Sequence, residues 1–412
     1  MPRFTRTTPR SRRTLRAAAA LAAGAALVLS GCSADHGSAS AGEGLAVVAT
    51  TTQLADFARE IGGDDVQVRG LLTPGGSAHH FDPTPADLLA LSEADVLIVN
   101  GAGLETFIDD AIEASGFTGE IITAADGIDI DEATEITAEG EAEAASGVQP
   151  AHDHAAHDHA DHDHAAEDHA AEDHADHDHA AEDHASDEPA GHDHADHEHA
   201  DHDHAEETHD HGSDDHAGHD HGPTNPHLWT SPRYAADMAR HIGAELARID
   251  QADAADIDAR TAAYTERLEA LDAWAAEQFA AVPEASRVLV SGHDSLRYYL
   301  HDYDIAFAGA ILPSFEDNAE PSAADIDALV AAIQERGVTA VFVESSMSPK
   351  LARTIAKEAG VQVIDAESLY ADSLGPEDSD GATYIGATVH NTRLILEAWG
   401  QEAGELPAAL QP

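Results

Sequence analysis

The sequence is poor in cysteine, in basic residues and in aromatic residues. Cys32 is the one cysteine in 412 residues, so no disulfide can form within the chain, and the fold must be held by packing alone. Only 20 Lys and Arg stand against 79 Asp and Glu, which gives a formal net charge of −59. Such a charge repels nucleic acids and anionic membrane surfaces and attracts cations. We therefore expect no nucleic-acid partner and a positively charged ligand.

Long apolar runs are also scarce, and the clearest one lies near the N-terminus. Residues 17–29 follow a start that contains six arginines, and they lead into "LVLSGCSAD" around Cys32. The run is too short for a stable membrane-spanning helix, and the whole of 1–32 has the pattern of a signal peptide, exported by either the general or the twin-arginine route. Its end resembles a bacterial lipobox, which predicts a lipidated Cys32 at the mature N-terminus, outside the cytoplasm and anchored to the cell membrane. An ordinary buried thiol is the alternative.

Short apolar strands alternate with amphipathic helices in two parts of the chain. The first part runs from "LAVVATT" at 45–51 to "EIITAAD" at 120–126, and the second from "RVLVSG" at 287–292 to a last helix at 383–399. This alternation predicts an α/β fold with two lobes, each a parallel sheet flanked by helices. Between them, a long amphipathic helix is predicted at 253–279, with one face formed by Ile257, Tyr264, Leu268, Leu271 and Trp274,.

These patterns predict the following division of the chain. Residues 33–44 ("SADHGSASAGEG") are small and polar and predict a flexible tether,. The N-terminal lobe is expected at 45–252, the connecting helix at 253–283 and the C-terminal lobe at 284–412. Within the first lobe, residues 128–222 have dense charge and no hydrophobic period, so we predict a disordered His/Asp-rich insertion there.

Four short stretches outside the insertion each offer one good metal ligand at or after the end of a strand or turn. They are "GGSAHHFDPTPADL" with His79, "TNPHLWTSP" with His227, "LVSGHDSLRYYL" with His293 and "SLYADSLGPED" with Asp372. Three neutral imidazoles and one carboxylate suit a borderline ion such as zinc in tetrahedral geometry. His241 and His301 lie in helical stretches and are expected to face solvent, and His390 in the last helix is expected to have a hydrogen-bonded structural role. Glu344 ends the strand "VTAVFVE" and is a candidate acceptor for a ligand histidine N–H.

Taken together and in order, these stretches resemble the metal-binding solute-binding proteins of ABC-type zinc and manganese importers. The resemblance runs from about residue 45 to 399 and includes "DPTPADLLAL", "NGAGLETFI", "NPHLW", "SGHDSLRYYL" and "LYADSLGP". It implies two α/β lobes joined by a rigid helix, and it places the ligands at His79, His227, His293 and Asp372. The usual Asp-Pro before the first histidine is here Ser77 and Ala78, so His80 remains an alternative to His79.

The resemblance also bears on the metal and on the partners. Manganese-type members carry a carboxylate at the third ligand position, where this chain has His293, so zinc is the expected transported ion and manganese the alternative. The expected partners are an ABC permease and its ATPase subunits, with a zinc metallochaperone as a further candidate, and the chain is expected to be a monomer. The second hypothesis for the function is a zinc buffer or storage lipoprotein that works without a transporter. A zinc hydrolase is disfavoured because no HExxH-type helix is present and four protein ligands would close the coordination sphere.

The insertion itself holds 22 of the 30 histidines, all within residues 151–222. Spacings of two and three residues are mixed within the "HDHA" units, so no helical face collects these histidines. Ordering about ten such residues around one ion would cost on the order of 10–20 kcal/mol in backbone entropy. We therefore expect several weak sites that collect zinc for a tighter site elsewhere, since a tethered chain raises the local ion concentration. A merely solubilising spacer is the alternative.

Overall fold

The computed structural model describes residues 44–77, 79, 81–146, 222–312 and 320–411. The predicted signal peptide, Cys32, the tether up to residue 43, His80 and residues 147–221 of the insertion lie outside these ranges. The described residues from 44 onward belong to one compact unit. In the described part of the chain, no helix combines the length and the apolar character that a membrane span needs.

A four-stranded parallel sheet forms the first part of this unit. Its strands are β1 (Leu45–Ala49), β2 (Val66–Gly70), β3 (Val96–Val99) and β4 (Glu120–Thr123), in the order β2-β1-β3-β4. The connections carry α1 (Thr52–Gly62), α2 (Pro85–Glu93) and α3 (Ile108–Ser115). Thr51 caps α1 by accepting the Leu54 N–H, and Thr84 forms a capping box with Asp87 at α2, which satisfies N–H groups that a helix start leaves unpaired.

A second set of parallel strands follows in the C-terminal part. β5 (Val288–Ser291) pairs with β6 (Ala306–Ala310), and β7 (Ala340–Glu344) pairs with β8 (Gln362–Leu369). β5 lies next to β7. The helices here are α7 (Arg297–Asp302), α8 (Ala323–Arg336) and α9 (Pro349–Ala359). Parallel strands flanked by helices in both parts confirm the predicted fold class.

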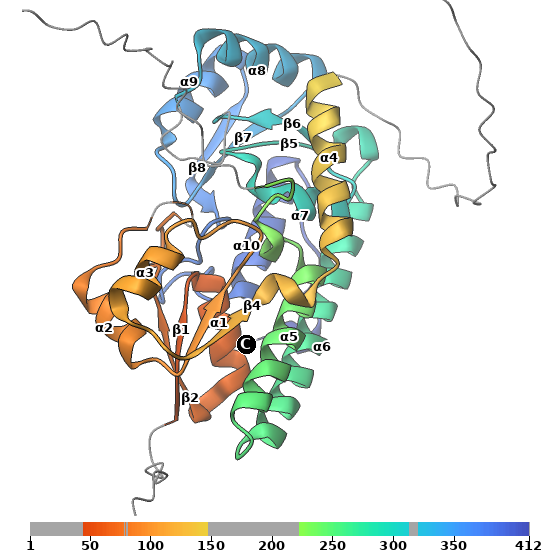
Figure 1. Ribbon diagram of the computed structural model, residues 1–412. Coiled ribbons are helices and arrows are strands. Elements are labelled where there is room, and N and C mark those ends of the chain that lie inside the picture. The colour runs from red at the N-terminus through yellow and green to blue at the C-terminus, as the bar shows by residue number, and fades with distance from the viewer. Residues whose placement is uncertain (1–43, 78, 80, 147–221, 313–319, 412) are drawn as a thin grey trace, which may run out of the picture. The chain divides into compact units, whose positions relative to one another are not determined.

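Three further helices pack on one another and on α1, and α10 also contacts β8 (Figure 1). They are α5 (Pro232–Ile249), α6 (Ala254–Ala280) and α10 (Tyr384–Ala398). α6 is the helix predicted at 253–279, and the residues expected on one face, from Ile257 to Trp274, are buried along α5. One continuous core runs from β1 through α5 and α6 to α10. The division into lobes at 45–252 and 284–412 stays a prediction.

The structure differs from the sequence-based prediction over residues 128–146. The insertion was expected to lack structure from residue 128, but α4 occupies Ile130–Ser146. Ala133, Ile136, Thr137 and Gly140 are buried there, and their spacing of three, one and three residues puts them on one helix face. That narrow face packs on α7 and β6, while the acidic residues stay on the others. The prediction followed the acidic composition and overlooked this stripe of small and apolar side chains.

Candidate metal centre

The four predicted ligands come from four separate connections of the fold. His79 lies in the connection from β2 to α2, His293 lies two residues after β5 ends, and Asp372 lies three residues after β8 ends. His227 precedes a short 3-10 turn, Leu228–Thr230, that leads into α5. Because the carboxyl ends of parallel strands meet at one edge of a sheet, loops that follow different strands can deliver side chains to one place.

The structure brings the four side chains together. One ligand atom from each of His79, His227, His293 and Asp372 lies within 4.8 Å of the others. The Nε2 atom of His227 is 2.9 Å from that of His79 and 3.1 Å from that of His293. Asp372 Oδ1 is 3.4 Å from His227 Nε2 and 3.2 Å from His293 Nε2. All four residues are at most 4 % exposed. We refer to this group as the His₃Asp cluster.

These distances fit a small ion bound by all four residues. In a tetrahedron with zinc bonds of about 2.0–2.1 Å, neighbouring donor atoms are about 3.3 Å apart, close to the measured separations. Asp372 Oδ1 is fully buried and accepts no hydrogen bond from the described residues. A buried acceptor of this kind is costly unless a cation or a donor faces it. The cluster therefore has the donors, the spacing and the unmet acceptor of a metal site.

Outer hydrogen bonds fix the orientation of two of the imidazoles. Asn225 Oδ1 accepts both the backbone N–H of His227 at 3.0 Å and Nδ1 of the same histidine at 2.7 Å. Glu344 accepts the backbone N–H of His293 at 3.0 Å, and its other oxygen lies 2.8 Å from His293 Nδ1. Because Asn225 Oδ1 can only accept, Nδ1 of His227 carries the proton and its Nε2 faces the cluster,. Glu344 lies beside Nδ1 of His293, where an acceptor for a ligand histidine N–H was expected, and that role stays a prediction.

Burial and nearby charges set the protonation of the cluster. Burial lowers the pKa of His227, and the charge of His293 lowers it further against the opposing effect of Asp372. Burial would also lower the pKa of His293, but the carboxylates of Glu344 and Asp372 outweigh it and raise that pKa well above its ordinary value. Burial alone would raise the pKa of Asp372, yet the two histidines hold it well below its usual range. A metal ion would replace the proton that His293 holds in this arrangement.

The loop that carries Asp372 is held from both sides. The carbonyl of Ala371 accepts Gln53 Nε2 at 3.0 Å and Trp229 Nε1 at 2.8 Å. On the other side of Asp372, Ser373 Oγ accepts the Gly75 N–H at 2.8 Å, a bond to the same loop that carries His79. The indole of Trp229 packs edge-on to the His227 ring. These bonds place the carboxylate and exclude solvent from behind the cluster.

The structure places the other histidines outside the cluster. His241, His301 and His390 take no part in it, and His390 Nε2 lies 3.2 Å from the carbonyl of Ser368. The sequence analysis missed Asn225, although the "NPH" turn that contains it was in view. Asn225 stands two residues before His227, a spacing that allows an amide side chain to reach both Nδ1 and the backbone N–H.

Known proteins resemble this chain over most of its length. The family model for zinc-uptake complex component A, periplasmic (ZnuA), matches residues 47–398. The chain is 27 % identical over 380 residues to the manganese-binding lipoprotein MntA of Bacillus subtilis, covering 91 % of this chain and 96 % of that one. It is 24 % identical over 390 residues to the iron-binding protein YfeA of Yersinia pestis, covering 94 % and 97 %.

Solved structures agree on the fold. The periplasmic zinc-binding protein TroA from Treponema pallidum superposes with a TM-score of 0.62 at 20 % identity, covering 87 % of this chain and 99 % of that one. A crystal structure of ZnuA gives a TM-score of 0.55 at 21 % identity, covering 85 % and 99 %. The members of this family bind solutes and are not enzymes, and they work with the permease and ATPase of an importer. With 47–398 matched, the chain belongs to the ZnuA family of metal-binding solute-binding proteins of ABC importers.

Proposed function

We propose that this chain captures Zn²⁺ in the His₃Asp cluster and delivers it to the permease of an ABC importer. The observation that carries the proposal is the convergence of three imidazole nitrogens and one carboxylate oxygen in a buried place. His79, His227, His293 and Asp372 are the proposed ligands. Four protein ligands leave no open position for a reacting water, which suits binding and release rather than hydrolysis.

The donor set favours zinc over manganese. Imidazole nitrogen suits zinc, whereas manganese prefers oxygen donors and a higher coordination number. Glu344 adds a second argument, because its buried carboxylate faces Nδ1 of His293 at 2.8 Å. A carboxylate side chain at position 293 would meet that charge at close range in a site without water. Glu344 therefore favours an imidazole over a carboxylate at position 293.

Manganese is the second candidate. Relatives that are named for manganese binding match over nine-tenths of the chain, among them MntA of Bacillus subtilis at 27 % identity.

Two further proposals are that the mature chain is held outside the cytoplasm by lipid at Cys32, and that it works as a monomer. Several relatives are named lipoproteins, which supports the anchor. Cys32→Ala is expected to release the chain from washed membranes.

The insertion is proposed to be an accessory collector. Residues 151–222 carry 22 histidines, whose weak sites would raise the zinc concentration beside the cluster. The cluster is assembled when the protein folds, whereas each site in the insertion would meet an ordering cost on binding. Deleting 151–222 is therefore expected to leave one tight zinc per molecule and to remove the weaker ions. Loss of the tight ion on deletion would contradict the assignment of the cluster.

Competition between the two metals tests the main proposal. Zinc and manganese are titrated against a chelator on the chain that lacks residues 151–222, together with His293→Ala and the matched surface variant His301→Ala. We expect the chain to bind zinc much more tightly than manganese. His293→Ala should lose this tight zinc binding, and His301→Ala should keep it. Comparable affinities for both metals would favour the manganese importer. Growth in zinc-limited medium that depends on both the chain and its permease would separate transport from a zinc buffer, which needs no permease.

A further inference from the structure

Asn225 joins the candidate metal centre to α4, the helix that the sequence analysis overlooked. We propose that α4 is a positioning element of this centre and acts on His227 through Asn225. The inference deepens the proposed function and rests on it, because it concerns how one of the proposed ligands is held.

Every polar group of Asn225 has a partner. Its side-chain oxygen holds His227, as described above, and its Nδ2 donates to the carbonyl of Asp294 at 2.7 Å. Its backbone N–H donates to Thr137 Oγ1 at 3.0 Å, and its carbonyl accepts Tyr298 Oη–H at 2.6 Å. The bond to Asp294 decides which way the amide points, because a flipped amide would set two oxygens against each other. The four bonds together fix the acceptor that His227 needs.

One of these bonds is made by α4, and a second is made by a tyrosine that contacts α4. Thr137 is 4 % exposed and projects from α4; its hydroxyl donates to the Ala133 carbonyl and so accepts from Asn225. Tyr298 Oη lies 3.2 Å from the same hydroxyl. One residue earlier, Thr224 Oγ1 lies 2.6 Å from Thr134 Oγ1 of α4. The chain that leads into His227 is thus fastened to α4 at two successive residues.

A second connection runs from α4 through Arg297. The guanidinium of Arg297 packs so closely on Gly140 that a Cβ there would lie 1.4 Å from Nη1. Arg297 donates from Nε at 3.0 Å, and also from Nη2, to the carboxylate of Asp294. The carbonyl of that same Asp294 receives the side-chain amide of Asn225. A shift of α4 would therefore disturb Asn225 from both ends.

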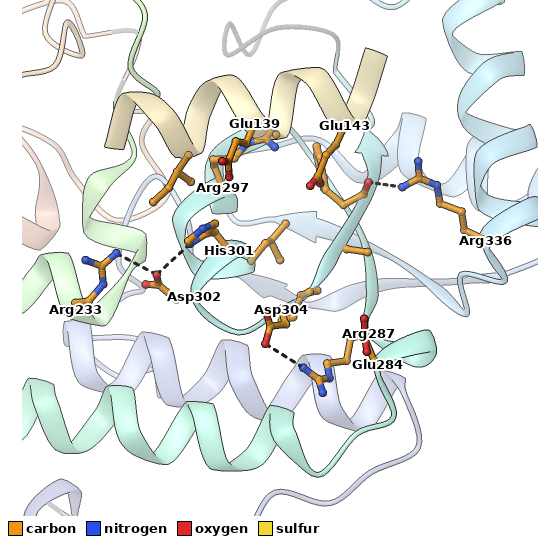
Figure 2. Close-up of a pocket in the computed structure, with 16 residues that line it drawn as sticks. Glu139, Glu143, Arg233, Glu284, Arg287, Arg297, His301, Asp302, Asp304 and Arg336 are labelled. Atoms are coloured by element: carbon orange, nitrogen blue, oxygen red, sulfur yellow. Dashed lines mark hydrogen bonds and ion pairs between the residues drawn. The ribbon is translucent and has the colours of Figure 1, made fainter. Parts of the chain in front are cut away.

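The docking of α4 depends on this narrow contact. Beside it lies a cavity of about 460 Å³, into which Glu139 and Glu143 project from α4 (Figure 2). Arg287 lies on the side of the cavity opposite α4, and Arg336 lies at its flank. Ile136 and Gly140 border the same cavity, so the contacts of the stripe from Ala133 to Gly140 with α7 and β6 hold α4 in place. Thr137 and Arg297 are the members of this contact that lead on to Asn225.

Adjacent tyrosines of α7 provide a matched test in the full chain. Tyr298→Phe removes the hydroxyl that binds the Asn225 carbonyl, and Tyr299→Phe removes an equally buried hydroxyl that lies 2.7 Å from Thr392 Oγ1. A tight chelator reports the strongest zinc site alone, and the visible absorption of bound Co²⁺ reports its geometry. We expect Tyr298→Phe to weaken that site about 5- to 20-fold and to alter the Co²⁺ bands, while Tyr299→Phe lowers thermal stability alone.

Substitutions at Thr137 provide the conservative rescue. Thr137→Val removes the acceptor for the Asn225 N–H with little change in shape, and Thr137→Ser restores it. Valine is expected to weaken the tight zinc site and serine to keep it. Equal affinities for both, or equal losses in Tyr298→Phe and Tyr299→Phe, would overturn the inference. His227→Ala distinguishes failure of this inference from failure of the proposed function. If His227→Ala still binds zinc tightly, the proposed site is wrong. If His227→Ala loses tight zinc binding but Tyr298→Phe keeps the wild-type affinity, only the role of α4 is refuted.

Discussion

Replacing Glu344 by glutamine tests how much the outer contacts of the cluster contribute to metal affinity. Glu344 is fully buried; one of its oxygens accepts the backbone N–H of His293, and the other lies 2.8 Å from Nδ1 of the same residue in an ion-pair contact. A carboxylate can face both nitrogens, one with each oxygen. Glutamine has a single acceptor oxygen, so its NH₂ group must face one of the two nitrogens. The change keeps the size of the side chain and removes one of the two contacts.

The magnitude follows from the donor that is left over. A buried donor without a partner costs about 1–3 kcal/mol, and loss of an outer partner of a metal-bound histidine costs about 10- to 100-fold in affinity. Because the backbone N–H of His293 has a fixed direction, we expect the glutamine oxygen to accept that N–H. The NH₂ group then faces Nδ1 of His293, and the contact that orients the ring is lost. Zinc affinity of Glu344→Gln is then expected to fall about 10- to 100-fold, as measured by chelator competition at pH 8.

The control is Glu358→Gln, which makes the same chemical change at an exposed position of α9. Its zinc affinity is expected to equal that of the wild type. Thermal unfolding of both metal-free variants shows whether Glu344→Gln remains folded at the temperature of the titration. Unchanged affinity in a folded Glu344→Gln chain would refute the reasoning, because it would mean that the orientation of His293 does not depend on the carboxylate.

Three further predictions follow from single features of the structure. His293→Glu should bind zinc and manganese poorly because it faces buried Glu344, and adding Glu344→Gln should shift metal preference toward manganese in the competition titration. Burial raises the pKa of Asp56 to about 6, so its protonated form stabilises the fold fully below about pH 4, and this contribution is lost as the pH rises through 6. Asp56→Asn removes the titrating group. In denaturant unfolding of the metal-free chain, the free energy of unfolding should therefore change with pH by roughly 3 kcal/mol less in this variant than in the wild type. Gly140→Ala should lower stability by about 1–3 kcal/mol in thermal unfolding, despite the better helix propensity of alanine, because its Cβ meets Arg297,.

Much of the fold could be predicted because its signals are local. Strands such as 96–99 are apolar on both faces, and helices such as 254–280 carry a regular buried stripe, so period and length identify each element. The four candidate ligands could be proposed because each lies in a loop or turn that the alternation of elements makes visible. Their distances and burial could not be predicted, since they depend on how the two strand systems pack together.

Glu344 and Asn225 differ in how clearly the sequence marks them, for a similar physical reason. Glu344 ends β7, in which every other residue is apolar. A lone carboxylate at such a position needs a partner, so the sequence alone suggests that Glu344 accepts a hydrogen bond. Asn225 gave no such signal, because asparagine before proline is ordinary in a turn. Its role depends on Thr137 and Tyr298, which are 88 and 73 residues away in the chain.

The case of α4 shows why composition misled at one place. Dense acidic residues normally prevent a segment from burying enough apolar surface to fold, yet α4 needs only four small or apolar positions. Its acidic residues also assist, since Asp131 and Glu132 in the first turn favour the positive end of the helix dipole,. A helix held by so few contacts is placed by its neighbours, and Arg297 and Tyr298 of α7 are those neighbours. Because the same two residues lead to Asn225, the least predictable helix of the described chain is also connected to His227 through Asn225.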